Sequence, residues 1–299
     1  MKNEIRQNFE KINCKNVMER KSYPAWFFGN ERTNKILLTF IGCLKKEEKV
    51  KKIFCIGGGG DFTFSILSII EKISEVYTCD NRPTAALNID IKKSIVDKFS
   101  YEEIIDIFSR KKINKIETYN KIVDGISIES KTVLNNILDK CNGNNFLHCI
   151  RKSGLWYKYS FGQIKHINDY LLYLTDKEKY LCLKQNLEKL AICYGDFNDN
   201  LKLFNDKYFD LIYVSNIFDS KNYCNDVDGY IRTIKNKLTS NGYLFIVTQN
   251  NPEILINIFK EKFGFVIYLK ETHKFKMFES LFGHYSYSFV IVRINNNLN

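Results

Sequence analysis

Short continuous apolar runs alternate with helically spaced apolar positions along the chain, and this alternation predicts strands and helices in turn. The run Lys52–Ile56 ends at four glycines and is typical of a buried strand followed by a tight turn. Helical spacing follows over Phe62–Ile73. A second strand is predicted over Glu75–Asp80, and a second helix over Thr84–Phe99, which Pro83 is suited to begin at its first turn.

The same alternation returns near residue 190 and completes the predicted sheet. Further strand-like runs occupy Leu190–Tyr194, Phe209–Ser215, Tyr243–Thr248, Phe265–Leu269 and Tyr285–Val292. The pair Asn241-Gly242 is a turn signal before one of these strands, and Pro252–Phe263 is spaced as a helix. Strands that alternate with helices predict an α/β fold, a largely parallel sheet with helices on both faces. The last two strands have no long helix between them, which predicts an antiparallel hairpin at one edge.

These patterns divide the chain into regions with different expected roles. Residues 1–50 are expected to form a helical N-terminal segment, in which the aromatic cluster Tyr23–Gly29 is a candidate lid. Residues 51–299 are expected to form the catalytic domain. Within it, residues 111–190 are expected to be a mostly helical insertion over the carboxyl edge of the sheet, with the strongest helical spacing over Lys177–Leu190.

Composition places the chain among globular proteins. Hydrophobic residues make up 44% and charged residues 26%, which argues against intrinsic disorder. The longest apolar stretch, near Ile36–Leu44, is shorter than the roughly 20 residues that a membrane span needs. The charged start Met1–Glu4 lacks the apolar core of a signal peptide. We therefore expect a cytoplasmic protein without an integral membrane segment.

Cysteine, histidine and charge patterns exclude several further classes of protein. The nine cysteines contain no C-x-x-C pair, and several lie inside apolar runs, which argues against a disulfide scaffold or a structural zinc site. The four histidines have no partners at ligand spacing, so no metal is assigned. The net charge of +11 is spread over scattered lysines, which favours solvated faces over a nucleic-acid surface. Peripheral contact with an anionic membrane stays open.

A glycine-rich turn is the main chemical signal. Gly57–Gly60 and Asp61 come directly after the first predicted strand and before a helix, where glycine lets a ligand approach the backbone closely. Asp80 ends the next strand, 20 residues beyond Gly60, where a nucleotide-binding sheet places a carboxylate for the ribose hydroxyls. This combination predicts a ligand that contains a nucleoside.

Two features favour S-adenosylmethionine (SAM) over a dinucleotide. The third glycine of the dinucleotide fingerprint would fall at Phe62, whose ring disfavours close packing under a pyrophosphate. Asp61 brings a negative charge beside the turn, which would repel phosphate and attract a sulfonium.

The chain resembles a class I SAM-dependent transferase through the glycine-rich loop, Asp80 and the pair Gly195-Asp196. More narrowly, it resembles the betaine-lipid type SAM:diacylglycerol 3-amino-3-carboxypropyl transferase family. The matching stretches are Ile56–Asp61, Cys79–Pro83, Tyr101–Glu103, Tyr194–Phe197, Val214–Asp219 and Tyr285–Phe289. They lie within residues 50–110 and 190–293. The resemblance implies a Rossmann-like, seven-stranded SAM-dependent methyltransferase fold, in which the carboxylate of Asp196 binds the adenine amino group.

The resemblance also implies a reaction. Many SAM methyltransferases carry an acidic residue where this chain has Cys55, and its absence fits a site that holds the methionine end differently. The first hypothesis is therefore transfer of the 3-amino-3-carboxypropyl group to an alcohol or amine of a lipid or small molecule, with release of methylthioadenosine. The alternatives are a methyltransferase that acts on a small molecule, an RNA-modifying SAM enzyme and a catalytically silent SAM-binding module.

The predicted site residues fall into two sets. Those assigned to SAM are Gly57, Gly58, Gly59, Gly60, Asp61, Asp80, Asn81, Arg82, Asp196, Phe197 and Ser215. Those assigned to catalysis or acceptor binding are Asp219, Asn216 and Ser215, which follow the strand Phe209–Ser215. Arg82 is a candidate for the substrate carboxylate or for a simple ion pair, and Gly154–Gly162 is a candidate acceptor loop.

Overall fold

The computed structural model describes residues 33–43, 50–108, 116–139, 171–219, 226–249, 251–276 and 284–294. The candidate lid Tyr23–Gly29 and the candidate acceptor loop Gly154–Gly162 lie outside these described residues. The described residues divide into two compact units, the first within Met1–Lys35, Gly57–Ile73 and Tyr77–Asp196, and the second within Ile36–Ile56, Ser74–Val76 and Phe197–Asn299.

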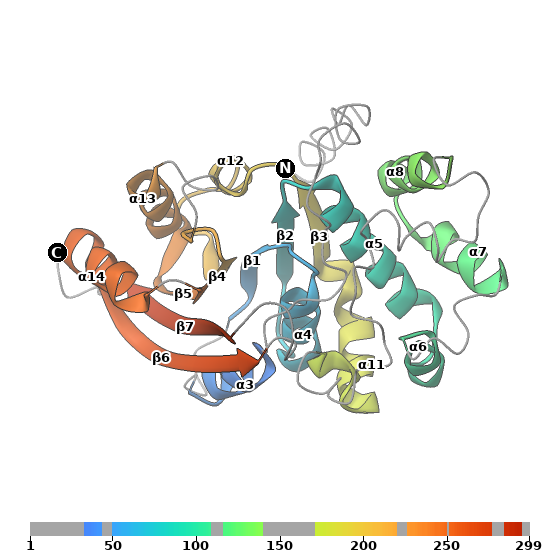
Figure 1. Cartoon of the computed structure of the whole chain (residues 1–299), viewed down its shortest axis with the longest axis horizontal. Coiled ribbons are helices and arrows are strands. Elements are labelled where there is room, and N and C mark those ends of the chain that lie inside the picture. The colour runs from blue at the N-terminus through green and yellow to red at the C-terminus, as the bar shows by residue number, and fades with distance from the viewer. Residues whose placement is uncertain are drawn as a thin grey trace. The chain divides into compact units, whose positions relative to one another are not determined.

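The described strands form a seven-stranded mixed sheet of order β3-β2-β1-β4-β5-β7-β6 (Figure 1). Its strands are β1 Lys52–Ile56, β2 Glu75–Asp80, β3 Leu190–Tyr194, β4 Phe209–Ser215, β5 Leu238–Thr248, β6 Phe265–Lys276 and β7 His284–Ile294. The pairs β1–β4 and β4–β5 are parallel, whereas β7 is antiparallel to both β5 and β6. The predicted α/β class with seven strands and an antiparallel edge hairpin is confirmed.

The helices alternate with the strands as the sequence pattern predicts. They are α3 Thr33–Cys43, α4 Asp61–Ile69, α5 Pro83–Lys98, α6 Tyr101–Phe108, α7 Ile116–Gly125, α8 Ile128–Asp139, α11 Lys177–Asn186, α12 Phe197–Lys202, α13 Val227–Lys237 and α14 Pro252–Phe263, with the 3₁₀ turns η2 Leu172–Leu174 and η3 Leu187–Lys189. Pro83 begins α5, where its missing N–H has no helical partner to lose. No helix among the described residues is long and apolar enough to cross a membrane.

In the first unit, α5 carries the helices α7 and α8 along its side (Figure 1). The hydroxyl of Ser94 donates to the carbonyl of Ile122 at 2.7 Å and ties α5 to α7. The backbone N–H and hydroxyl of Ser127 donate to the Asp90 carboxylate at 2.8 and 2.7 Å, just before α8 begins. These contacts attach the helical region to α5.

In the second unit, an aromatic cluster fills the core beside β1. Phe54 is fully buried, and its ring packs edge to face against Phe197, Phe204 and Phe209 at centroid distances of 5.2, 5.7 and 5.3 Å. Consecutive residues of β1 and β4 are buried, so both faces of these strands are covered. This two-sided burial explains why they appear in the sequence as continuous apolar runs.

The strand ends differ from those predicted. β5 begins at Leu238, because Phe209 of β4 pairs with Leu238 while Leu211 pairs with Tyr243. The extra residues of β5 at this irregularity include Asn241-Gly242, so the predicted turn lies inside the strand. β6 runs to Lys276, beyond the predicted end at Leu269, because it pairs with β7 through backbone hydrogen bonds that need no apolar side chains. α4 ends at Ile69, earlier than the predicted Ile73.

Candidate functional site

The glycine-rich loop joins β1 to α4 and belongs to the first unit. The N–H of Gly57 donates to the carbonyl of Cys79 in β2, and the N–H of Gly60 donates to the carbonyl of Gly57 at 2.7 Å, which closes a tight turn. Gly58 and Gly60 have φ angles of 49° and 81°, in the left-handed region that glycine adopts at low cost. The predicted strand–turn–helix arrangement is confirmed.

The glycines of this loop have different surroundings. A Cβ on Gly60 would lie 2.9 Å from Cγ1 of Ile89, and one on Gly57 would lie 3.0 Å from the Cys79 carbonyl oxygen. A Cβ on Gly58 would meet no atom of the described residues within 4 Å. Gly57 and Gly60 therefore serve close packing, whereas Gly58 borders open space that a ligand can enter.

Asp80 lies beside this loop, as predicted. It is the last residue of β2 and only 5% exposed. One carboxylate oxygen, Oδ2, accepts from the Gly58 N–H at 2.9 Å. Arg82 donates to the same carboxylate from its backbone N–H at 2.9 Å, from Nε at 3.0 Å and from Nη2 at 3.1 Å. Of the two roles considered for Arg82, the structure describes the ion pair.

Asp61 is buried rather than turned toward a ligand. It is 4% exposed, and its Oδ1 lies 2.7 Å from Nζ of Lys92 and accepts from the Tyr173 hydroxyl at 3.1 Å. Because Lys92 neutralises this carboxylate, the expectation that Asp61 attracts a sulfonium by its charge is wrong as an electrostatic argument. Its assignment to SAM binding stays a prediction. Lys92 and Tyr173 were not predicted, since no motif marks residues 31 and 112 positions away from Asp61 as its partners.

The end of β3 meets β2 near the same carboxylate. The N–H of Gly195 donates to the backbone carbonyl of Asp80 at 3.1 Å, which places Asp196 directly after a residue hydrogen-bonded to β2. Phe197 is buried and packs against Phe54, so its ring has a structural contact in the second unit. Its assignment to SAM stays a prediction, as does that of the exposed Asn81.

The predicted catalytic residues lie together in the second unit. Ser215 ends β4, and Asn216 follows it with a φ of 55°, a left-handed conformation that asparagine tolerates better than most residues. The side-chain amide of Asn216 donates to the Ser215 hydroxyl at 3.1 Å. The Asp219 carboxylate accepts from the Thr248 hydroxyl and from the Gln249 N–H, the latter at 2.8 Å. The structure brings these three residues to the carboxyl end of β4, and their joint action with the glycine-rich loop stays a prediction.

Replacing Asp219 with alanine is expected to lower the free energy of unfolding by about 1–3 kcal/mol, because the Thr248 hydroxyl and the Gln249 N–H lose their acceptor. Asp228→Ala is the matched control, since Asp228 forms an exposed ion pair with Lys262, and it is expected to change stability by less than about 0.5 kcal/mol. Urea unfolding measures both. Equal stability of the two variants would contradict an anchoring role for Asp219.

Among the described residues, no group of three or more His, Cys, Asp or Glu side chains is placed to hold a metal ion. Cys55, Cys79 and Cys193 are buried and form no disulfide, and burial raises the pKa of the Cys193 thiol to about 12. These thiols are therefore packing residues.

Comparison with known proteins yields structural matches alone. No protein-family model and no curated protein matches the sequence. A precorrin-6y C5,15-methyltransferase from Geobacter metallireducens shares 9% identity at a TM-score of 0.42, with 91% of this chain and 97% of that chain covered. An rRNA methyltransferase from Streptomyces viridochromogenes shares 11% identity at a TM-score of 0.42, with 95% of this chain and 93% of that chain covered. A SAM-dependent methyltransferase from Aquifex aeolicus shares 11% identity at a TM-score of 0.36, with 95% of this chain and 100% of that chain covered. At these identities and scores the matches carry no argument about activity, and the fold rests on the strand order above.

Proposed function

We propose that the protein is a SAM-dependent transferase that binds the adenosine part of SAM at the Gly57–Gly60 loop and Asp80. The observation that carries this proposal is the pairing of Gly58 with Asp80. Gly58 borders open space, and its N–H donates to a buried carboxylate at the carboxyl end of the neighbouring strand. The carboxyl ends of parallel strands are where open α/β sheets bind nucleotide-containing ligands.

The residues present suit an adenosine ligand. The Asp80 carboxylate can accept hydrogen bonds from two ribose hydroxyls if they replace Nε and Nη2 of Arg82, whose side chain is 30% exposed. Asp196 follows Gly195, which is hydrogen-bonded to Asp80, and offers a carboxylate to an adenine amino group. When bound, SAM supplies an electrophilic carbon on a sulfonium centre, so the protein's own task is to hold and orient it.

Methyl transfer is the activity that we propose first. The preference for aminocarboxypropyl transfer depended on the resemblance to the betaine-lipid type family and on Cys55 in place of an acidic residue. Cys55 is fully buried within β1, so its identity carries little information about how the methionine end of SAM is held. Aminocarboxypropyl transfer stays a sequence-based prediction that product analysis tests.

We propose a small molecule rather than RNA as the acceptor. Several surface lysines of the described residues pair with carboxylates, including Lys177 with Glu102 and Lys262 with Asp228. Such pairs reduce the positive potential that a phosphate backbone would meet.

The test incubates the purified full chain with SAM and identifies the nucleoside product by mass spectrometry, with a small-molecule cell extract or an RNA fraction as the source of acceptor. S-adenosylhomocysteine formed only with the small-molecule extract is the expected result. Methylthioadenosine as the product would contradict methyl transfer and indicate aminocarboxypropyl transfer. A product that forms only with the RNA fraction would contradict the proposed small-molecule acceptor and indicate RNA. Absence of both product and SAM binding would overturn the proposed function.

A further inference from the structure

A buried ion pair contacts the glycine-rich loop. Lys92 of α5 is 1% exposed, and its Nζ lies 2.7 Å from Oδ1 of Asp61 and 2.7 Å from the carbonyl oxygen of Gly59. The ammonium therefore bridges the first residue of α4 and the third glycine of the loop. Because the Gly59 carbonyl is held by Lys92, the peptide between Gly59 and Gly60 has a defined orientation.

Tyr173 completes the cluster from η2. Its hydroxyl donates to the oxygen of Asp61 that faces Lys92, and its ring packs against Phe64 of α4 at a centroid distance of 5.6 Å. Both Tyr173 and Lys92 are almost fully buried. Lys92 of α5 and Tyr173 of η2, two separate elements of the first unit, thus both donate to Asp61.

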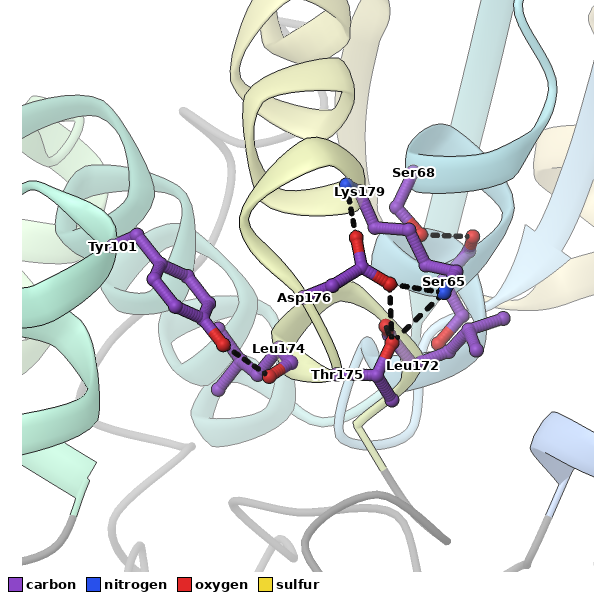
Figure 2. A network of polar contacts seen from close by, with 8 residues as sticks. All are labelled: Ser65, Ser68, Tyr101, Leu172, Leu174, Thr175, Asp176 and Lys179. Carbon is purple, nitrogen blue, oxygen red and sulfur yellow. Dashed lines mark hydrogen bonds and ion pairs between the residues drawn. The ribbon is translucent and has the colours of Figure 1, made fainter.

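The short element η2, which carries Tyr173, is closed by a hydrogen bond of its own and joined to Tyr101 of α6 by another, as Figure 2 shows. The Thr175 hydroxyl donates to the carbonyl of Leu172 at 2.8 Å, and the Tyr101 hydroxyl donates to the carbonyl of Leu174 at 3.1 Å. Asp176 then caps α11 by accepting from the N–H of Lys179 at 2.8 Å. These contacts keep η2 in one position and with it the Tyr173 hydroxyl.

Burial makes this cluster sensitive to the loss of any charge. Burial lowers the pKa of the Lys92 ammonium, and the neighbouring Asp61 carboxylate opposes part of that shift. Burial also raises the pKa of Tyr173 well above its usual value, so the phenol stays a hydrogen-bond donor. A buried ion pair seldom adds stability over a well-packed apolar pair. The contact of the Lys92–Asp61 pair with Gly59 therefore indicates that the pair orients the glycine-rich loop.

We propose that Lys92, Asp61 and Tyr173 are positioning residues that fix the glycine-rich loop in its ligand-binding conformation before SAM arrives. This inference rests on the proposed function for the identity of the ligand. The Lys92 ammonium holds the Gly59 carbonyl on the α5 side of the loop and leaves the Gly58 side open. The charges of Lys92 and Asp61 cancel, so this ion pair adds no net charge beside the loop to attract or repel a sulfonium.

The test compares the wild-type full chain with Lys92→Met, the charge-balanced double variant Lys92→Met/Asp61→Asn, and the control Lys98→Met. Lys98 lies on the same helix and forms an exposed pair with Asp97. Three quantities are measured: the melting temperature, amide hydrogen exchange at Gly58 and Gly60 relative to Phe245 in ligand-free protein, and the SAM dissociation constant.

Lys92→Met removes the positive charge that pairs with the buried Asp61 carboxylate, and the melting temperature of this variant is expected to fall by about 10 °C. The double variant removes both charges and is expected to regain most of that loss. Its Gly59 carbonyl still lacks a donor, so exchange at Gly58 and Gly60 is expected to rise about 10-fold relative to Phe245. Its SAM dissociation constant is expected to rise roughly 10- to 100-fold, while Lys98→Met changes none of the three quantities.

A purely structural pair would behave differently. Exchange at Gly58 and Gly60 that rises no more than at Phe245 in the double variant, or an unchanged SAM dissociation constant, would overturn the positioning role. If the wild-type protein does not bind SAM, the proposed function fails on its own. The ligand-free exchange measurement then still decides whether Lys92 positions the loop.

Discussion

Replacing Asp80 with alanine is expected to weaken SAM binding at least about 100-fold. The substitution removes the buried carboxylate that we propose as the acceptor for the ribose hydroxyls, and each hydrogen bond to a charged group contributes about 1.5–3 kcal/mol. It also frees the Gly58 N–H, which the carboxylate holds at 2.9 Å in the ligand-free protein. Isothermal titration calorimetry with SAM measures the loss directly.

The matched control for this prediction is Asp97→Ala. Asp97 lies on α5 in an exposed ion pair with Lys98, and its removal is expected to leave the SAM dissociation constant within about twofold of wild type. Circular dichroism and a melting curve establish that both variants are folded. Wild-type affinity in a folded Asp80→Ala variant would exclude Asp80 from the SAM site and contradict the proposed function.

Alanine at Gly60 is expected to affect mainly the stability of the protein, whereas alanine at Gly58 is expected to affect mainly SAM binding. Gly60→Ala places a Cβ 2.9 Å from the Ile89 side chain at a φ of 81°, so we expect the free energy of unfolding to fall by about 2–4 kcal/mol. The Cβ of Gly58→Ala would meet no atom within 4 Å in the part of the chain that the structure describes, at a φ of 49°, so we expect this variant to lower the free energy of unfolding by only about 1–2 kcal/mol.

Ligand binding is expected to separate the same two variants. The added methyl group of Gly58→Ala enters the open space beside the loop, so SAM binding is expected to weaken about 10-fold or more. Urea unfolding and calorimetry together measure the two effects. If Gly58→Ala bound SAM as wild type does, the ligand would have to approach the loop from another side.

The sheet is largely determined by local pattern. β1 and β4 were predictable because both faces of each strand are buried. Apolar residues such as Phe54 and Ile212 therefore follow one another without interruption in the sequence. Pro83 at the start of α5 was predictable because its fixed φ suits the first turn of a helix. The extension of β6 to Lys276 was not, because an antiparallel ladder is held by backbone groups that every residue type except proline offers.

The sequence by itself also determined that a glycine-rich turn follows β1 and that a carboxylate, Asp80, ends β2. Only the tertiary structure decided how these groups are used. It separated Gly58, which borders open space, from Gly60, whose neighbour Ile89 comes from a different helix. It also paired Asp61 with Lys92. The carboxylate that the sequence predicted to be an exposed negative charge is therefore one partner of a buried ion pair without net charge. The physical reason is that side-chain charge and backbone clearance depend on which distant residues the fold brings within a few ångströms, and a linear pattern carries no record of those distances.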